Sequence, residues 1–204
     1  MSGVGLVAQL LAAAAPDEDD PAVLDGAFAA FLDFGIRRTT MAEIARRSGV
    51  SAATLYRRYP GKDAVIRAVL ARESRRFVRA VDARVDRTAT AREQVVAAFV
   101  AFTTELSGNQ LLRRLLTTEP ESTLPLLTTE AGPVLAVGRE YVRGDLARLQ
   151  ATGGLPAFDV EPVAEIFARL ALSLALTPDG VIPVEDAAAA AEFARAHITA
   201  LVRL

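Results

Sequence analysis

The stretch from Thr39 to Val65, TTMAEIARRSGVSAATLYRRYPGKDAV, decides the fold of this 204-residue chain. TMAE fits a capping box in which the Thr40 hydroxyl and the Glu43 carboxylate each satisfy a free amide at a helix start. That helix ends at Gly49, because a residue without a Cβ turns left-handed at little steric cost. Ser51 caps a following helix, which Pro60 and Gly61 end. The stretch therefore predicts two short helices joined by a tight turn.

The residue types in this stretch suit a helix-turn-helix. Ile44, Val50 and Leu55 are the apolar residues that point inward, and Ala45 is small where two helices would cross. The second helix then presents an outward face that a major groove about 12 Å wide can accept. The residues on this face are Ala52, Ala53, Tyr56 and Arg57.

Charge is distributed unevenly along the chain, although the net charge is only −2. Residues 1–36 carry six acidic and no basic side chains, and the next segment, 36–62, carries seven basic ones against a single acid, Glu43. These basic residues are Arg37, Arg38, Arg46, Arg47, Arg57, Arg58 and Lys62. A basic segment in a nearly neutral chain suggests a localised anionic partner. Arg57 and Arg58 could also be an ordinary solvated pair.

Several chemistries are excluded or disfavoured by composition. The chain has no cysteine, which excludes disulfides, thiolate zinc sites and cysteine nucleophiles, and it has one histidine, His197. We therefore expect no metal site, no cofactor and no enzyme activity. The apolar N-terminal stretch VGLVAQLLAAAAP has no positive residue before it, and no apolar run reaches membrane-spanning length, so a cytoplasmic protein is expected.

Hydrophobic periodicity predicts an all-α fold of about nine helices and no strand. Beyond the two short helices, the expected helices cover 21–34, Lys62 to about Arg87, 91–106, 109–117, 123–150, 161–177 and 185–203. We divide the chain into an N-terminal extension (1–20), a helix-turn-helix domain (21–66) and a larger helical domain (67–204).

The segment from about residue 21 to 70 resembles the DNA-binding region of the tetracycline-repressor (TetR) family of transcriptional regulators. The resemblance is carried by Gly35, Thr39–Thr40, Ile44–Ala45, Gly49–Val50–Ser51, Thr54–Leu55–Tyr56, Tyr59 and Lys62–Asp63. It implies a homodimer in which each subunit offers its third helix to one half of a palindromic operator in double-stranded DNA. It also implies that residues 67–204 bind a small, largely apolar effector and form the dimer interface.

Carried over residue by residue, the resemblance places phosphate contacts at Thr40, Thr54, Tyr56, Tyr59 and Lys62, with base-edge contacts at Ala52 and Ala53. Further expected DNA contacts are Arg37, Arg38, Thr39, Arg46, Ser51 and Arg57. Two departures stand out: Ala53 replaces a frequent glycine, and the arm PDEDD at 16–20 is acidic where many members have a basic one. We therefore expect specificity to depend on thymine methyls and DNA shape.

Candidate residues in the larger domain follow the same resemblance. The candidate ligand contacts are Phe99, Phe102, Arg113, Leu116, Tyr141, Phe167 and Leu170. The candidate dimer contacts are Ile166, Leu170, Leu174, Phe193, His197, Ile198 and Leu201. A packed or solvated role for Arg113, Tyr141 and His197 is the alternative.

The sequence thus predicts a DNA-binding transcriptional regulator, a repressor released from its operator by a small molecule. The alternative is a helical small-molecule-binding protein with a vestigial DNA-binding domain.

Overall fold

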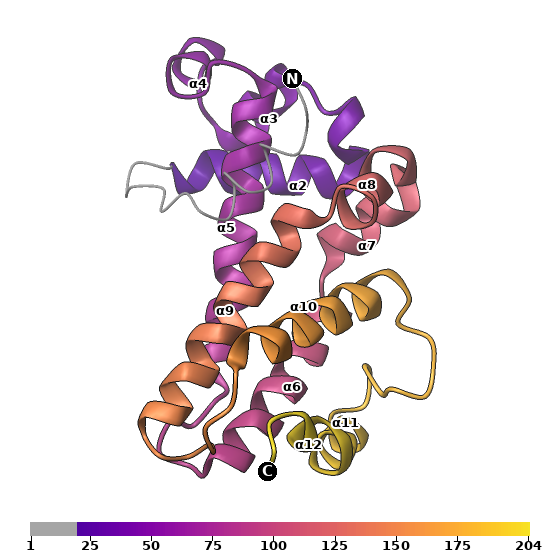
Figure 1. Ribbon diagram of the computed structural model, residues 1–204. Coiled ribbons are helices and arrows are strands. Elements are labelled where there is room, and N and C mark those ends of the chain that lie inside the picture. Colours follow the sequence, from indigo (N-terminus) through magenta and orange to yellow (C-terminus); the bar gives the residue numbers. More distant parts are fainter. Residues whose placement is uncertain (1–19) are drawn as a thin grey trace. The chain divides into compact units, whose positions relative to one another are not determined.

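The computed structural model describes residues 20–204, and the expected N-terminal extension lies almost wholly outside them. The described part is helical and contains no strand, which confirms the all-α prediction (Figure 1). Its elements are α2 (Pro21–Arg38), α3 (Met41–Ser48), α4 (Ala52–Arg58), α5 (Lys62–Ala83), α6 (Ala91–Ser107), α7 (Gln110–Thr118), α8 (Pro120–Leu127), α9 (Gly132–Ala151), α10 (Val160–Leu176), α11 (Ala187–Phe193), the π-helical turn η1 (Ala194–Ile198) and α12 (Thr199–Leu201).

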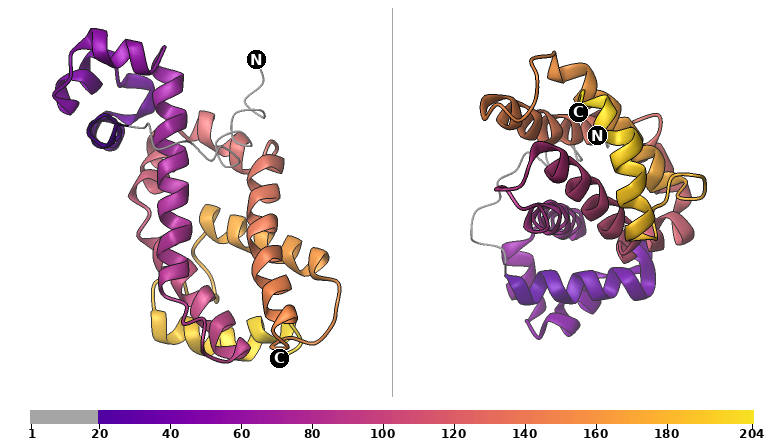
Figure 2. Two further views of the ribbon diagram at one scale, coloured as in Figure 1. Left: turned by 90° about the vertical axis from the view of Figure 1, so that its left-hand side faces the viewer. Right: turned by 90° about the horizontal axis from the view of Figure 1, so that it is seen from below.

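The contacts between residues divide the chain into two compact units. The first contains the described residues through Arg76 together with Asn109–Ala131, and the second contains Phe77–Gly108 and Gly132–Leu204. Helix α5 runs without a break from the first unit into the second (Figure 2). The helices α7 and α8 therefore belong with the helix-turn-helix, although the sequence assigned them to the larger domain; the boundary at 66/67 stays a prediction.

The first unit has one apolar core, to which α2, α3, α4, α5 and α7 all contribute. Phe31 of α2, Ile44 of α3 and Val65 of α5 are completely buried, and Leu55 of α4 is nearly so. Leu111 and Leu115 of α7 join the same core. Burial of this apolar surface holds the two short helices in place, because helices of seven and eight residues are not stable alone.

Helices α3 and α4 begin at the capping residues that the sequence predicted, and α3 ends at the predicted Gly49. The Thr40 hydroxyl accepts from the Glu43 amide, the Ser51 hydroxyl accepts from the Thr54 amide, and Gly49 adopts a left-handed φ of 67°. The predicted capping box at Thr40 is only half formed, because the Glu43 carboxylate pairs with Arg46 and Arg47 instead. A complete capping box occurs at Thr90 and Glu93, where α6 begins.

The second unit contains α6, α9, α10 and the C-terminal helices. Helix α9 packs against α10, and α11 with η1 packs against α6 (Figures 1 and 2). One cluster of buried side chains includes Leu146, Leu149 and Val202, and another includes Phe99 and Ile198.

Two predicted helices differ from the structure. The expected helix over 123–150 is two helices, α8 and α9, because Pro133 lacks an amide proton and is tolerated only in the first turn of a helix, where it stands as the second residue of α9. The expected helix over 185–203 is continuous from Ala187 but contains a π turn, in which the Thr199 amide donates to the Ala194 carbonyl. With the C-terminal elements taken as one helix, the described residues form ten helices rather than about nine.

Within residues 20–204, no single helix is long and apolar enough to cross a membrane, and only α6 and α7 taken together pass that test of length and composition.

Candidate nucleic-acid interface

Helix α4 presents the face that the sequence predicted. Ala52, Ala53, Tyr56 and Arg57 are all exposed, and the Tyr56 side chain is 54% accessible. On the opposite face Leu55 is only 1% accessible and lies in the core of the first unit. One short helix is thus anchored by a buried leucine and offers two methyl groups, a phenol and a guanidinium to solvent.

Tyr59, for which the resemblance predicts a phosphate contact, is buried. Its accessibility is 7%, and its ring belongs to the core of the first unit, with the apolar residues of α2 and α5. Tyr59 ends α4 and donates its amide to the Leu55 carbonyl at 2.8 Å. The side chain therefore fixes the position of α4 rather than extending the exposed face.

Most basic side chains between residues 36 and 62 bind protein groups. The Arg58 guanidinium pairs with Asp20 at 2.6 Å, Arg46 pairs with Glu43 at 2.7 Å, and Arg37 lies 3.6 Å from Glu121. Arg47 bridges Glu43 and Asp33, and Arg38 donates to the Phe34 carbonyl. Arg57 is the exception: its side chain makes no hydrogen bond or ion pair with any residue from 20 to 204.

The pairing at Glu43 has an electrostatic consequence. Hydrogen bonds from Arg46 and then from Arg47 stabilise the charged carboxylate, and they lower its pKa from 4.5 to about 2. Glu43 is therefore ionised at neutral pH and neutralises part of the positive charge on α3. The positive electrostatic potential at the surface of α3 is therefore weaker than the number of its arginines suggests.

Lys62 and Thr39 stabilise the end of α2. The Lys62 ammonium donates to the carbonyls of Ile36, Arg37 and Thr39 at 3.0–3.1 Å, which satisfies groups that a helix end leaves free. The Thr39 hydroxyl is buried and donates to the Gly35 carbonyl at 2.7 Å, with the Ala30 carbonyl oxygen 3.2 Å away. Phosphate contacts by these two side chains stay predictions, but their polar groups are already bonded within the chain.

The remaining polar candidates lie at helix starts. Thr40 and Ser51 are exposed and use their hydroxyls as caps, while Thr54 is half-buried with its hydroxyl 3.0 Å from that of Ser51. A hydroxyl that accepts from a backbone amide keeps a proton to donate, so a cap can also contact a phosphate.

Glu119 is a residue of this unit that the sequence did not single out. It stands between α7 and α8, is 8% accessible, and accepts a hydrogen bond from the Arg37 amide at 2.9 Å. Gly35 lies directly beneath it, with φ 78° and ψ 165°, and interrupts α2 one turn before its end. Only the fold brings Glu119 to this place, because 82 residues separate it from Arg37.

The seven candidate ligand residues do not form one group. Arg113 is exposed on α7, and Arg113 and Leu116 belong to the first unit. In the second unit Phe99 is buried against Phe193, and Phe102 packs edge-on against Phe77. Tyr141 donates its hydroxyl to Asp82 at 2.8 Å, and burial followed by this bond raises the pKa of the phenol. Phe167 and Leu170 are half-buried beside the apolar clusters.

The candidate dimer residues divide by exposure. Ile166, His197 and Leu201 are exposed, and Leu170 and Phe193 are half-buried. Leu174 and Ile198 are 6% and 3% accessible within a single chain, so neither presents its side chain to a partner. His197 lies on the turn η1 with its ring 4.8 Å from that of Phe193.

The geometry of α3 and α4 agrees with what comparisons with known proteins show. The family model described as "Bacterial regulatory proteins, tetR family" matches residues 23–69, and the model "Bacterial Tetracyclin repressor, C-terminal domain" matches residues 90–199. Uncharacterised HTH-type transcriptional regulators of Mycobacterium bovis and Mycobacterium tuberculosis are each 30% identical over 169 residues, which span 83% of this chain and 86% of the relative.

Solved structures show the same fold at lower identity. GusR of Salmonella enterica has a TM-score of 0.62 at 20% identity, with 92% of this chain and 99% of GusR covered. The fatty acid degradation regulator FadR of Bacillus halodurans has a TM-score of 0.60 at 14% identity, with 91% and 97% covered. With the exposed face of α4, the two family models and these relatives in agreement, the chain belongs to the tetR family of bacterial regulatory proteins and is a DNA-binding transcriptional regulator.

Proposed function

We propose that this regulator is a repressor whose homodimer binds a palindromic operator through α4 of each subunit and leaves it when a small-molecule effector binds residues 67–204. The observation that carries the proposal is the exposed face of α4, where Arg57 lacks any partner within residues 20–204. DNA binding, dimerisation and response to a small effector are typical of the family.

The exposed side chains of α4 divide into two chemical kinds. Ala52 and Ala53 suit contact with thymine methyl groups, which makes a weak sequence code that DNA shape must supplement. Tyr56 and Arg57 suit phosphate contact, which fixes the register of the helix on the duplex. Tyr59, Thr39 and Lys62 hold the unit together, and phosphate contact by Thr39 and Lys62 stays a prediction from the resemblance.

A ligand in the second unit has three covalent routes to the first. The chain passes between the units within α5, between Gly108 and Asn109, and between Ala131 and Gly132. The segment Asn109–Ala131 lies between the last two of these connections. Within it, Leu111 and Leu115 lie in the core of the first unit and Glu119 binds the end of α2. Successive major grooves on one side of the duplex are about 34–36 Å apart. An effector acts by favouring a dimer in which the separation of the two α4 helices differs from this value.

Fluorescence anisotropy on duplex DNA taken from beside the gene, across a salt series and with random duplex as control, tests the proposal. We expect tight binding to the cognate duplex, with a log–log salt slope of about −0.9 for each phosphate neutralised. Arg57→Ala should reduce the magnitude of the slope by about 0.9, the contribution of one phosphate. Arg76→Ala, which removes an exposed arginine of α5, should not change the slope.

The alternative of a small-molecule-binding protein with a vestigial DNA-binding domain is favoured by one observation. The internal ion pairs of Arg46, Arg47 and Arg58 leave fewer positive groups for phosphates than the sequence suggested. Equal, weak binding to both duplexes, with no effect of Arg57→Ala, would support this alternative over the repressor.

A further inference from the structure

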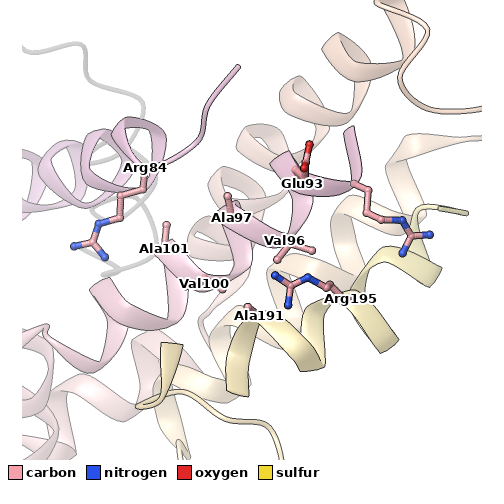
Figure 3. A pocket seen from close by; sticks show the side chains of 9 residues that line it. Arg84, Glu93, Val96, Ala97, Val100, Ala101, Ala191 and Arg195 are labelled. Atoms are coloured by element: carbon pink, nitrogen blue, oxygen red, sulfur yellow. The ribbon is translucent and has the colours of Figure 1, made fainter. Parts of the chain in front are cut away.

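A groove of about 540 Å³ lies in the second unit, between α6, η1 with α11, and the segment after α5 (Figure 3). This volume is within the roughly 300–1,000 Å³ that small-molecule sites occupy. Its apolar lining comes from two elements: α6 contributes Val96, Ala97, Val100 and Ala101, and α11 contributes Ala191. None of the ligand residues predicted from the sequence lines it.

The rim of the groove is basic. Three arginines line it, Arg84, Arg92 and Arg195, against a single carboxylate, that of Glu93. Figure 3 shows Arg84 and Arg195 on different sides of the apolar row on α6. The Glu93 carboxylate is already bonded, because it accepts from the amide and the hydroxyl of Thr90 at 2.9 and 2.6 Å.

Two of the three guanidiniums have no acidic partner in the part of the chain that the structure describes. Arg84 pairs with Glu105 at 2.7 Å, which neutralises it. Arg92 makes one hydrogen bond, to the Thr199 hydroxyl at 3.1 Å, and the Arg195 side chain makes no hydrogen bond or ion pair with any described residue. Arg92 and Arg195 against the charged Glu93 therefore leave one net positive charge next to the apolar surface.

The π turn η1 carries Arg195, and Thr199 directly after it binds Arg92. π turns are rare within α-helices and frequently occur at functional sites, and Arg195 stands inside this one. Thr199, which is 1% accessible, accepts from Arg92 and donates its own hydroxyl proton to the Arg195 carbonyl at 2.9 Å. A single buried hydroxyl thus links the start of α6 to the turn and fixes the backbone that carries Arg195.

We propose that this groove binds a small amphiphilic anion, with the apolar body on Val96, Ala97, Val100 and Ala191 and the carboxylate, sulfonate or phosphate group at the basic rim that Arg92 and Arg195 form. Guanidinium groups form charge-assisted hydrogen bonds with carboxylate, sulfonate and phosphate groups. The apolar residues of the groove would pack against the apolar body of the ligand. The role of the groove as the effector site rests on the proposed function above. Its binding of an amphiphilic anion can be tested without DNA.

The test uses two fluorescent probes of nearly the same shape. 8-Anilinonaphthalene-1-sulfonate carries a sulfonate, and N-phenyl-1-naphthylamine is the same molecule without it. We expect the sulfonate to bind the full-length protein saturably and more tightly than the neutral probe. Arg92→Gln and Arg195→Gln should each weaken the sulfonate on the order of tenfold and leave the neutral probe within about twofold. The control is Arg79→Gln, which removes an exposed arginine of α5 outside the groove lining.

The results separate the binding site from its role. Equal affinity for the two probes, or losses in Arg92→Gln and Arg195→Gln no larger than in Arg79→Gln, overturns the site. A change of oligomeric state in the groove variants, measured by light scattering, also overturns it, because the groove is then part of a subunit interface. Arginine-dependent binding that leaves operator affinity unchanged supports the site and overturns only its role as effector site.

Discussion

Replacement of Gly35 by alanine tests how α2 is joined to the segment between α7 and α8. At φ 78° and ψ 165° the backbone of Gly35 is in a region that is essentially confined to glycine, and other residues there cost about 1–3 kcal/mol. A Cβ at this position would also lie 2.3 Å from a Glu119 carboxylate oxygen. The carboxylate must therefore move and give up its hydrogen bond from the Arg37 amide.

Loss of that bond adds about 1–3 kcal/mol, because a partly buried amide and a charged group both lose a partner. We therefore expect Gly35→Ala to lower the free energy of unfolding by about 2–6 kcal/mol, a large part of the roughly 5–15 kcal/mol typical of a protein. Urea-induced unfolding followed by circular dichroism measures the change.

Gly49→Ala is the matched control. Gly49 also has a positive φ, 67°, but a Cβ there would meet nothing within 4 Å, so only the left-handed cost of about 1–2 kcal/mol applies. The double variant Gly35→Ala with Glu119→Ala should destabilise less than the sum of the single variants, since the clash and the lost bond are then counted once. Equal costs for the two glycine variants, with additive effects of Glu119→Ala, would refute a specific contact between Glu119 and this turn.

Three further predictions concern single side chains. Leu55→Ala should lower the free energy of unfolding by about 2–5 kcal/mol because the side chain is buried, whereas Tyr56→Ala should weaken operator binding with an unchanged urea midpoint; the opposite pattern would mean that α4 is oriented differently. Ile166→Arg should convert dimers to monomers in light scattering, since this side chain is 49% exposed on α10, and an intact dimer would place the interface elsewhere. The stability that the low pKa of Glu43 provides is present above pH 4.5 and is lost as the pH falls towards 2, so Glu43→Gln should flatten the acid limb of urea midpoints measured against pH; an unchanged limb would show that the bonds with Arg46 and Arg47 do not hold in solution.

The helix-turn-helix could be predicted because its determinants are local. Thr40, Gly49 and Ser51 act through backbone groups three or four residues away, so their type and spacing identify the helix ends. The inward positions Ile44 and Leu55 follow from helical periodicity, and both are buried. Ala52, Ala53, Tyr56 and Arg57 then had to face outward, and they do.

Local signals did not indicate which polar groups would remain free. Tyr59 is buried and Lys62 binds three carbonyls at the end of α2, because α2 and α5 bring their own surfaces to these residues. Arg47 also pairs with Asp33, 14 residues earlier, and Arg58 pairs with Asp20, 38 residues earlier, and both distances are beyond the reach of a spacing argument.

The sequence alone determined the helical class and the exposed face of α4, since both depend on contacts within one or two turns of helix. It also determined the family resemblance, which is a match of residue types at fixed positions. Only the tertiary structure decided that Glu119 binds the end of α2, that α7 and α8 belong with the helix-turn-helix, and that Arg92 and Arg195 share the buried hydroxyl of Thr199. The Arg37–Glu119 and Arg92–Thr199 contacts join residues 82 and 107 positions apart, and the packing of helices, rather than their periodicity, selects which distant side chains meet.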